Sequence, residues 1–100
     1  MSKPTKSERD HMARVASLPC VLCERLGQHQ WTRTTVHHLR AGQGAGQRAS
    51  NYLVVALCQD CHTDGRLGMH GDRTLLRIAN VDELDLLGDT IAGLLDGAAA

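Results

Sequence analysis

Large aromatic side chains are almost missing from this sequence. Its 100 residues include no Phe, and Trp31 and Tyr52 are the only aromatic residues, 2% of the chain. Aromatic rings normally supply much of the buried area of a core, so a domain this small needs another source of stability. Small domains obtain it from disulfides or from a structural metal. We therefore expect a single domain over residues 1–100 that is held together by one of these two devices.

A long apolar run is missing too. The first six residues are polar, and no stretch approaches the length that spans a bilayer, so neither a secretory signal nor a membrane partner is expected. This predicts a cytoplasmic protein. In the reducing cytoplasm, paired cysteines more often bind metal than form disulfides.

The chain has no net charge, but its two halves differ in sign. Residues 1–50 contain eight Lys and Arg against three Asp and Glu, whereas residues 51–100 contain three against eight. A basic half is the electrostatic footprint of a nucleic-acid-binding protein, with the acidic half turned away. Ordinary solvated charge on both halves is an equally good interpretation of this asymmetry alone.

The four cysteines form two C-x2-C pairs, Cys20 with Cys23 and Cys58 with Cys61, with 34 residues between the pairs. Structural zinc sites take four tetrahedral ligands, usually as two close pairs from distant parts of a chain. Two short disulfide loops or a redox C-x-x-C motif are the alternatives, and the presence of two such units disfavours both. The pattern predicts a structural zinc in a treble-clef arrangement, whose binding free energy also stabilises the fold.

The N-terminal segment predicts a basic tail and then a helix. Residues 1–6 form the tail, and apolar positions at helical spacing predict a helix over residues 7–18. Ser7 followed by Asp10 resembles a capping box in which Asp replaces the usual Glu or Gln. The next segment, residues 20–27, is expected to be a tight turn, or knuckle, that directs two sulfurs at one ion.

The middle of the chain predicts two strands and a short helix. β-Branched residues favour a strand within residues 32–39, and a bounded apolar run predicts a buried strand over residues 52–57. Residues 28–31 are expected to be extended and residues 41–50 to form a glycine-rich loop. The short helix is expected over residues 59–64.

The C-terminal helix is expected over residues 82–96, with acidic residues opposite an apolar face. This face would pack against the body of the protein, against a second subunit, or against a protein partner. Its expected members are Leu84, Leu87, Ile91 and Leu94 or Leu95.

Histidines gather between and just after the cysteine pairs. His37 and His38 are neighbours on the first expected strand, where adjacent side chains point to opposite faces, so one can bind a metal while the other reaches a substrate. His62 and His70 follow the second cysteine pair, which would bring them near His37. Alternatively, His62 or His70 is a zinc ligand or a loop residue. No role is expected for the remaining histidines, His11 and His29.

Four short motifs occur in order along the chain: Leu18-Pro19-Cys20-x2-Cys23, Val36-His37-His38-Leu39, Ala49-Ser50-Asn51-Tyr52 and Leu57-Cys58-x2-Cys61-His62. Together they resemble the HNH endonucleases, and more narrowly the phage recombination-enhancement nucleases, over roughly residues 15–72. The resemblance implies a small α+β fold, in which a zinc-stabilised treble-clef or ββα-metal core over residues 19–72 has flanking helices. It also implies a bacterial or phage-encoded protein.

The resemblance also implies residue roles. His37 and His62 would bind a catalytic divalent cation, His38 would be the general base, and Asn51 would orient that base, with His70 as a third cation ligand. Many members of the family have Asp at the position of His37. Imidazole ligands suit Mn²⁺, Ni²⁺, Co²⁺ or Zn²⁺ better than Mg²⁺ alone.

The expected function is therefore a metal-dependent endonuclease that hydrolyses phosphodiester bonds in DNA. Arg33, Arg40 and Arg48 are the candidate phosphate contacts, and Trp31 is a candidate for stacking on a base. The alternative is a zinc-stabilised nucleic-acid-binding module without catalysis.

Overall fold

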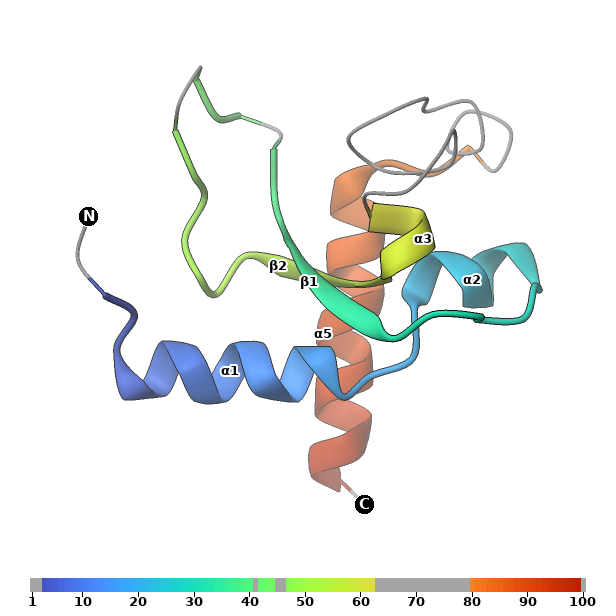
Figure 1. The fold of residues 1–100 in the computed structure, drawn as a ribbon, viewed down its shortest axis with the longest axis horizontal. Helices are drawn as coiled ribbons and strands as arrows, with labels where there is room; N and C mark the ends of the chain where they lie inside the picture. Colours follow the sequence, from blue (N-terminus) through green and yellow to red (C-terminus); the bar gives the residue numbers. More distant parts are fainter. Residues whose placement is uncertain (1–2, 41, 45–46, 63–79, 100) are drawn as a thin grey trace.

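The computed structural model describes residues 3–40, 42–44, 47–62 and 80–99. Helices surround a two-stranded antiparallel sheet, which confirms the α+β class (Figure 1). The elements are α1 (Lys6–Ala16), α2 (Val21–Leu26), β1 (Thr34–His38), β2 (Val54–Cys58), α3 (Gln59–His62) and α5 (Glu83–Ala99).

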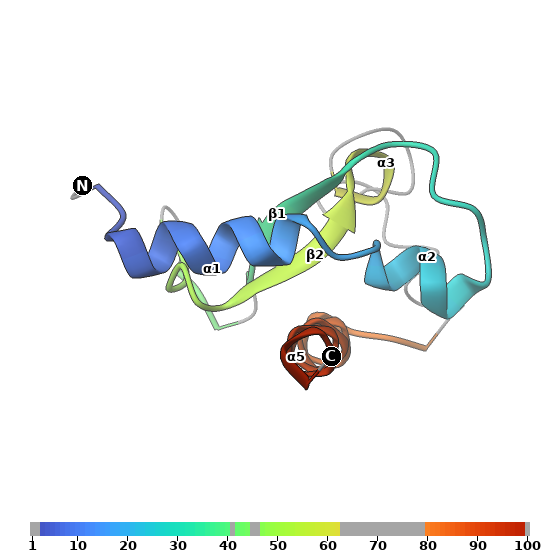
Figure 2. The same cartoon turned by 90° about the horizontal axis from the view of Figure 1, so that it is seen from below.

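The sheet is the centre of the molecule. β1 pairs with β2 in a register that puts Thr34 opposite Cys58 and His38 opposite Val54. Every residue of β2 is buried, whereas β1 is only half-buried except at His37. Figure 2 views α5 nearly end-on and places it on one side of the two strands, with α3 on the other. The fully apolar sequence of β2 follows from this position between helices.

Helix α1 begins one residue earlier than the sequence predicted, and its capping box is a different one. The N-cap is Thr5, whose Oγ1 accepts the backbone N–H of Glu8 at 3.1 Å, while Oε1 of Glu8 accepts the N–H of Thr5 at 2.8 Å. The proposed box at Ser7 is therefore wrong. Glu has the length to reach back to the N-cap N–H, which is why Thr5-x-x-Glu8 forms the box.

The expected knuckle contains a short helix, α2. The Cys20 sulfur accepts the Cys23 N–H at its start, and Gly27 ends it in the left-handed conformation, with φ of 65°, which glycine adopts without strain. The segment after it is not a strand. There the Gln30 side chain accepts the Cys20 N–H at 2.7 Å and donates to the carbonyl of Thr32 at 2.8 Å. One side chain thus provides hydrogen-bond partners for two backbone groups.

Helix α5 packs on β2 through a face that agrees only in part with the predicted one. Leu86 and Thr90 are fully buried, and the Thr90 hydroxyl accepts the Ala56 N–H of β2 at 3.2 Å. By contrast, Leu84 and Ile91 are 59% and 45% exposed. The predicted face is thus right at Leu87 and Leu94, which pack against the core, and wrong at Leu84 and Ile91. Leu86 and Thr90, which the prediction left out, are the fully buried positions.

Both aromatic rings lie outside the core. Trp31 is 81% exposed and Tyr52 is 48% exposed, so Trp31 is not a core residue. The core consists of aliphatic side chains and the four cysteines. Within the described residues, no helix is long and apolar enough to cross a membrane.

Candidate metal centre and histidine site

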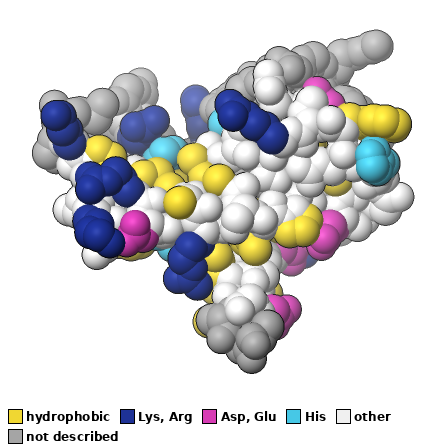
Figure 3. Space-filling view, turned by 60° about the horizontal axis from the view of Figure 1, so that its bottom comes forward, with side chains coloured by type: hydrophobic (Ala, Val, Ile, Leu, Met, Phe, Trp, Pro, Cys, Tyr) yellow, Lys and Arg dark blue, Asp and Glu magenta, His cyan; other side chains and the backbone are white. Residues whose placement is uncertain are grey.

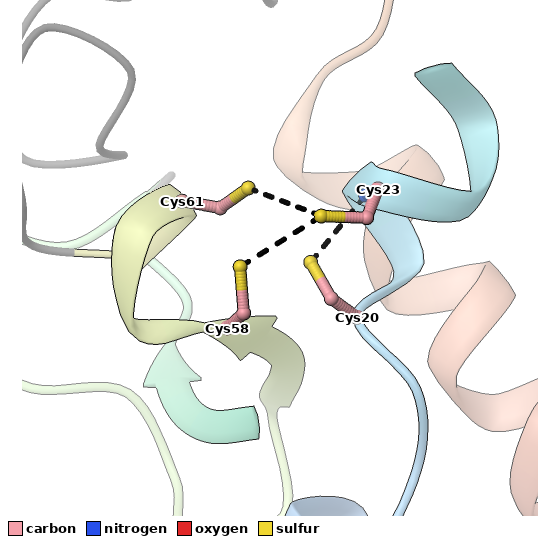
Figure 4. A group of neighbouring side chains, drawn as sticks. All are labelled: Cys20, Cys23, Cys58 and Cys61. Atoms are coloured by element: carbon pink, nitrogen blue, oxygen red, sulfur yellow. Dashed lines mark hydrogen bonds between the residues drawn. The ribbon is translucent and has the colours of Figure 1, made fainter. Parts of the chain in front are cut away.

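Four cysteine sulfurs converge from three elements (Figure 4). Cys20 and Cys23 come from the start of α2, Cys58 ends β2, and Cys61 lies on α3. All four side chains are buried, and their sulfur atoms lie within 4.8 Å of one another.

The geometry fits a tetrahedral zinc ion. With Zn–S bonds of about 2.3 Å, a regular tetrahedron sets its sulfurs about 3.8 Å apart. The Cys23 sulfur lies 3.8 Å from the sulfurs of both Cys58 and Cys61. A disulfide would require sulfurs about 2 Å apart, and none of the four cysteines is in a disulfide. The cluster is thus compatible with structural zinc.

Without a cation, three of the sulfurs differ in how readily they lose a proton. The pKa of Cys20 is lowered to about 5, first by a hydrogen bond from the Cys61 thiol and also by backbone N–H groups of Cys58 and Cys23. Burial raises the pKa of Cys23 to about 11, and the nearby Cys20 thiolate adds to this. The pKa of Cys61 is raised too, because its thiol proton is held by Cys20. A divalent cation would favour the thiolate form of all four sulfurs.

The two neighbouring histidines of β1 face different surroundings, as expected for adjacent strand residues. His37 is fully buried, and its Nε2 lies 2.6 Å from Oε2 of Glu83, the first residue of α5. The same carboxylate accepts the backbone N–H of Arg40. Since a carboxylate only accepts, Nε2 of His37 carries a proton, and in the neutral form of the ring the lone pair is on Nδ1.

His62 lies beside His37. The centres of the two rings are 5.0 Å apart in an edge-to-face arrangement. Nδ1 of His62 lies 2.9 Å from the hydroxyl of Thr35, which itself donates to the Leu57 carbonyl. The Thr35 hydroxyl has one proton, which it donates to the Leu57 carbonyl, so its oxygen must accept from His62. Nδ1 of His62 is therefore the donor, and the lone pair of the neutral ring is on Nε2.

Two of the three proposed cation ligands can be located. His37 and His62 are neighbours, and both have a partner that fixes the tautomer, as metal-binding histidines usually do. Within the part of the chain that the structure describes, the four cysteines are the one group of three or more ligand side chains close enough to hold an ion together. His70 lies outside the described residues.

On the other side of β1, His38 contacts Asn51. Its Nε2 lies 2.8 Å from Oδ1 of Asn51, which is in the turn before β2. The amide nitrogen of Asn51 donates to Oε2 of Glu8 on α1 at 3.0 Å. The pair proposed from the sequence is thus in contact, and the structure adds a third member, Glu8.

The three proposed phosphate-binding arginines are all exposed. Figure 3 shows further Lys and Arg side chains over the end of the molecule formed by α1. Arg33 precedes β1, whereas Arg40 and Arg48 lie in the segment that joins the two strands. The segment from His38 to Asn51 therefore carries two exposed basic residues.

Two acidic residues of this site were missed from the sequence. Glu83 was assigned only to an acidic helix face, and nothing local distinguishes it from the other acids there. Glu8 had a usable signal, because Thr5-x-x-Glu8 is a better capping box than the one chosen. Its contact with Asn51 joins residues 43 positions apart, which no local pattern reveals.

The chain matches no protein-family model, no curated protein and no solved structure. A function for this chain can therefore be inferred only from the arrangement of its own residues.

Proposed function

We propose that this protein is a metal-dependent endonuclease of the HNH type, which hydrolyses phosphodiester bonds in DNA. The observation that carries the proposal is the contact between His38 and Asn51, with 2.8 Å between Nε2 and Oδ1. It supports an amide-oriented imidazole at the end of a strand, which is what a general base requires. The order of strand, loop, strand and short helix, with cysteines at the junctions, supports a treble-clef or ββα-metal core.

In this proposal His38 takes a proton from the attacking water. Asn51 accepts from Nε2–H of His38, so the ring lone pair is on Nδ1, the nitrogen that would act as base. A positioned general base contributes about 10²- to 10⁴-fold to such a reaction.

The residues that would hold a catalytic cation are His37, through Nδ1, and His62, through Nε2. The contacts to Glu83 and Thr35 leave the lone pairs on these two nitrogens, and metal-binding histidines usually have such a hydrogen-bond partner on the other ring nitrogen. When bound, such a cation stabilises charge that develops on the phosphate and on the leaving oxygen. His70 stays a proposed third ligand.

Phosphate contacts would come from the exposed arginines, Arg33, Arg40 and Arg48, and from the basic end of the molecule at α1. The exposed ring of Trp31 is available for stacking on a base. The zinc–cysteine centre takes no part in the chemistry; it fixes α2, β2 and α3 so that the histidines converge.

Nicking of supercoiled plasmid DNA by the zinc-loaded protein tests this proposal, with Mg²⁺, Mn²⁺ and Ni²⁺ added in turn. His38→Ala should lower the nicking rate about 100-fold or more while zinc content and the circular dichroism spectrum stay unchanged. The matched control is His29→Ala. His29 is an exposed histidine, and its ring contacts the ring of Trp31. Full activity in His38→Ala would refute the proposal.

The second candidate function is a zinc-stabilised nucleic-acid-binding module without catalysis. It is favoured by the single metal cluster found within the described residues and by the basic side chains around α1. Titration of zinc-loaded protein with Mn²⁺ separates the two functions. The nuclease requires a further binding event that is weakened in His62→Ala, whereas the binding module requires DNA binding with no such event.

A further inference from the structure

A chain of hydrogen bonds runs from the start of α1 to the ring of His38. Glu8 accepts from the amide nitrogen of Asn51 at 3.0 Å, and Asn51 Oδ1 lies 2.8 Å from His38 Nε2. The three residues come from a helix, a turn and a strand, so the sequence separates them widely while the fold joins them.

The chemistry of the groups decides the direction of each bond. A carboxylate has no proton to donate, so the amide NH₂ of Asn51 must face Glu8. The amide oxygen must then face His38, which can meet it only with an N–H on Nε2. The carboxylate at one end thus determines the tautomer of the imidazole at the other.

Glu8 is itself held firmly. Its other carboxylate oxygen accepts the Thr5 N–H at 2.8 Å in the capping box. One turn along the same face of α1, the ring of His11 contacts the ring of Tyr52, the residue after Asn51, with 5.3 Å between ring centres. Two contacts therefore fix α1 against the turn that carries Asn51.

The carboxylate is also ionised over a wide pH range. The pKa of Glu8 lies below its ordinary value, first because the Thr5 N–H stabilises the anion and then because the Asn51 amide does. Protonation, which would reverse the direction of the chain, is thereby disfavoured.

We propose that Glu8 is a positioning residue, which acts through Asn51 to keep neutral His38 in the Nε2–H tautomer with its lone pair on Nδ1. The tautomer assignment stands on the geometry alone, and its catalytic consequence rests on the proposed nuclease function. A wrong tautomer would present N–H instead of a lone pair to the water, which removes the base without removing the ring.

Glu8→Gln is the decisive variant. Gln is the other residue found in capping boxes, so its oxygen can keep the Thr5 contact and preserve α1. Its NH₂ would then face Asn51, whose amide must turn and offer NH₂ to His38. Nε2 must become the acceptor, and the ring changes to the Nδ1–H form.

The tautomer is read from two-bond ¹H–¹⁵N correlations of the full-length, zinc-loaded protein labelled with ¹⁵N-histidine, at about pH 8.5, where an ordinary imidazole is neutral. We expect Nε2–H in the wild type, mostly Nδ1–H in Glu8→Gln, and a mixture in Glu8→Ala, which removes the acceptor without supplying a donor. The matched control is Asp10→Asn, an exposed acid on the same helix that pairs with Lys6. It removes the same charge and should keep Nε2–H.

The outcomes separate this inference from the nuclease proposal. If Glu8→Gln keeps a pure Nε2–H signal for His38, the inference is wrong, whatever the nicking assay gives. If the tautomer changes and nicking falls about 100-fold while Asp10→Asn is normal, both stand. A tautomer change in a protein whose wild type nicks no DNA leaves the inference intact and removes only the nuclease proposal.

Discussion

His37 of β1 and Glu83 of α5 form a buried hydrogen bond, with 2.6 Å between Nε2 and Oε2. This contact fastens the start of the last helix to the strand that carries the histidine doublet. Because Glu83 also accepts the Arg40 N–H, one carboxylate serves two donors.

We predict that Glu83→Ala lowers the free energy of unfolding by about 2–4 kcal/mol, because both donors would lose a buried acceptor. Urea unfolding followed by circular dichroism measures the change. Glu24→Ala, at an exposed acid of α2, is the control and should change stability by less than about 0.5 kcal/mol. A small effect of Glu83→Ala would mean that the two donors find other acceptors at little cost.

The two faces of α5 should respond differently to the same substitution. Leu86→Ala removes a fully buried side chain and should cost about 2–5 kcal/mol. Leu84→Ala, two residues earlier and 59% exposed, should cost less than about 1 kcal/mol. Thermal unfolding of both variants checks this. Equal costs, together with a dimeric mass in sedimentation, would instead place Leu84 in an interface between two copies.

Zinc should be needed for the fold. We expect one tightly bound zinc per chain by elemental analysis, and loss of helical circular dichroism when a strong chelator removes it, because metal-binding free energy on the order of 10 kcal/mol is then lost from folding. Addition of zinc should restore the wild-type spectrum but not that of Cys61→Ser. A chelated protein that keeps its spectrum and melting temperature would show that the aliphatic core is sufficient.

Zinc affinity should rise steeply with pH. Between about pH 6 and pH 8, Cys20, with its pKa lowered to about 5, is already a thiolate, whereas Cys23, with its pKa raised to about 11, is still a thiol. The pKa of Cys61 is raised as well, so zinc must displace at least two protons. For a folded zinc-free cluster, affinity should therefore increase by at least about 100-fold per pH unit, and more steeply for an unfolded zinc-free chain, whose thiols have ordinary pKa values of about 8.5. Competition with a chelator of known proton affinity measures the slope. A slope of tenfold or less would contradict this charge distribution.

The sequence predicts the parts of this protein that depend on local pattern. Two C-x2-C pairs locate the sulfur cluster, because ligand spacing in a zinc site is short and repetitive. β-Branched and apolar runs locate the two strands. The contact between His38 and Asn51 was anticipated from the resemblance alone, since the two residues are 13 positions apart.

The parts that could not be predicted depend on long-range hydrogen bonds. The buried face of α5 includes Thr90, whose hydroxyl accepts the Ala56 N–H, and a pattern of apolar residues cannot predict such a bond. Glu83 and Glu8 were missed for the same reason. Each is an acid near the start of a helix, where carboxylates are common, and only the fold brings it to a histidine or to the amide beside one.

The exposed position of Trp31 has a practical consequence for measurements of unfolding and of DNA binding. An indole that is 81% exposed is already hydrated in the folded protein, so its emission should shift little on denaturation. Fluorescence would then report a stable protein as unresponsive to urea, while amide circular dichroism records its unfolding. The same ring becomes a useful probe when DNA is added, because a base stacked on it would quench emission that unfolding leaves unchanged.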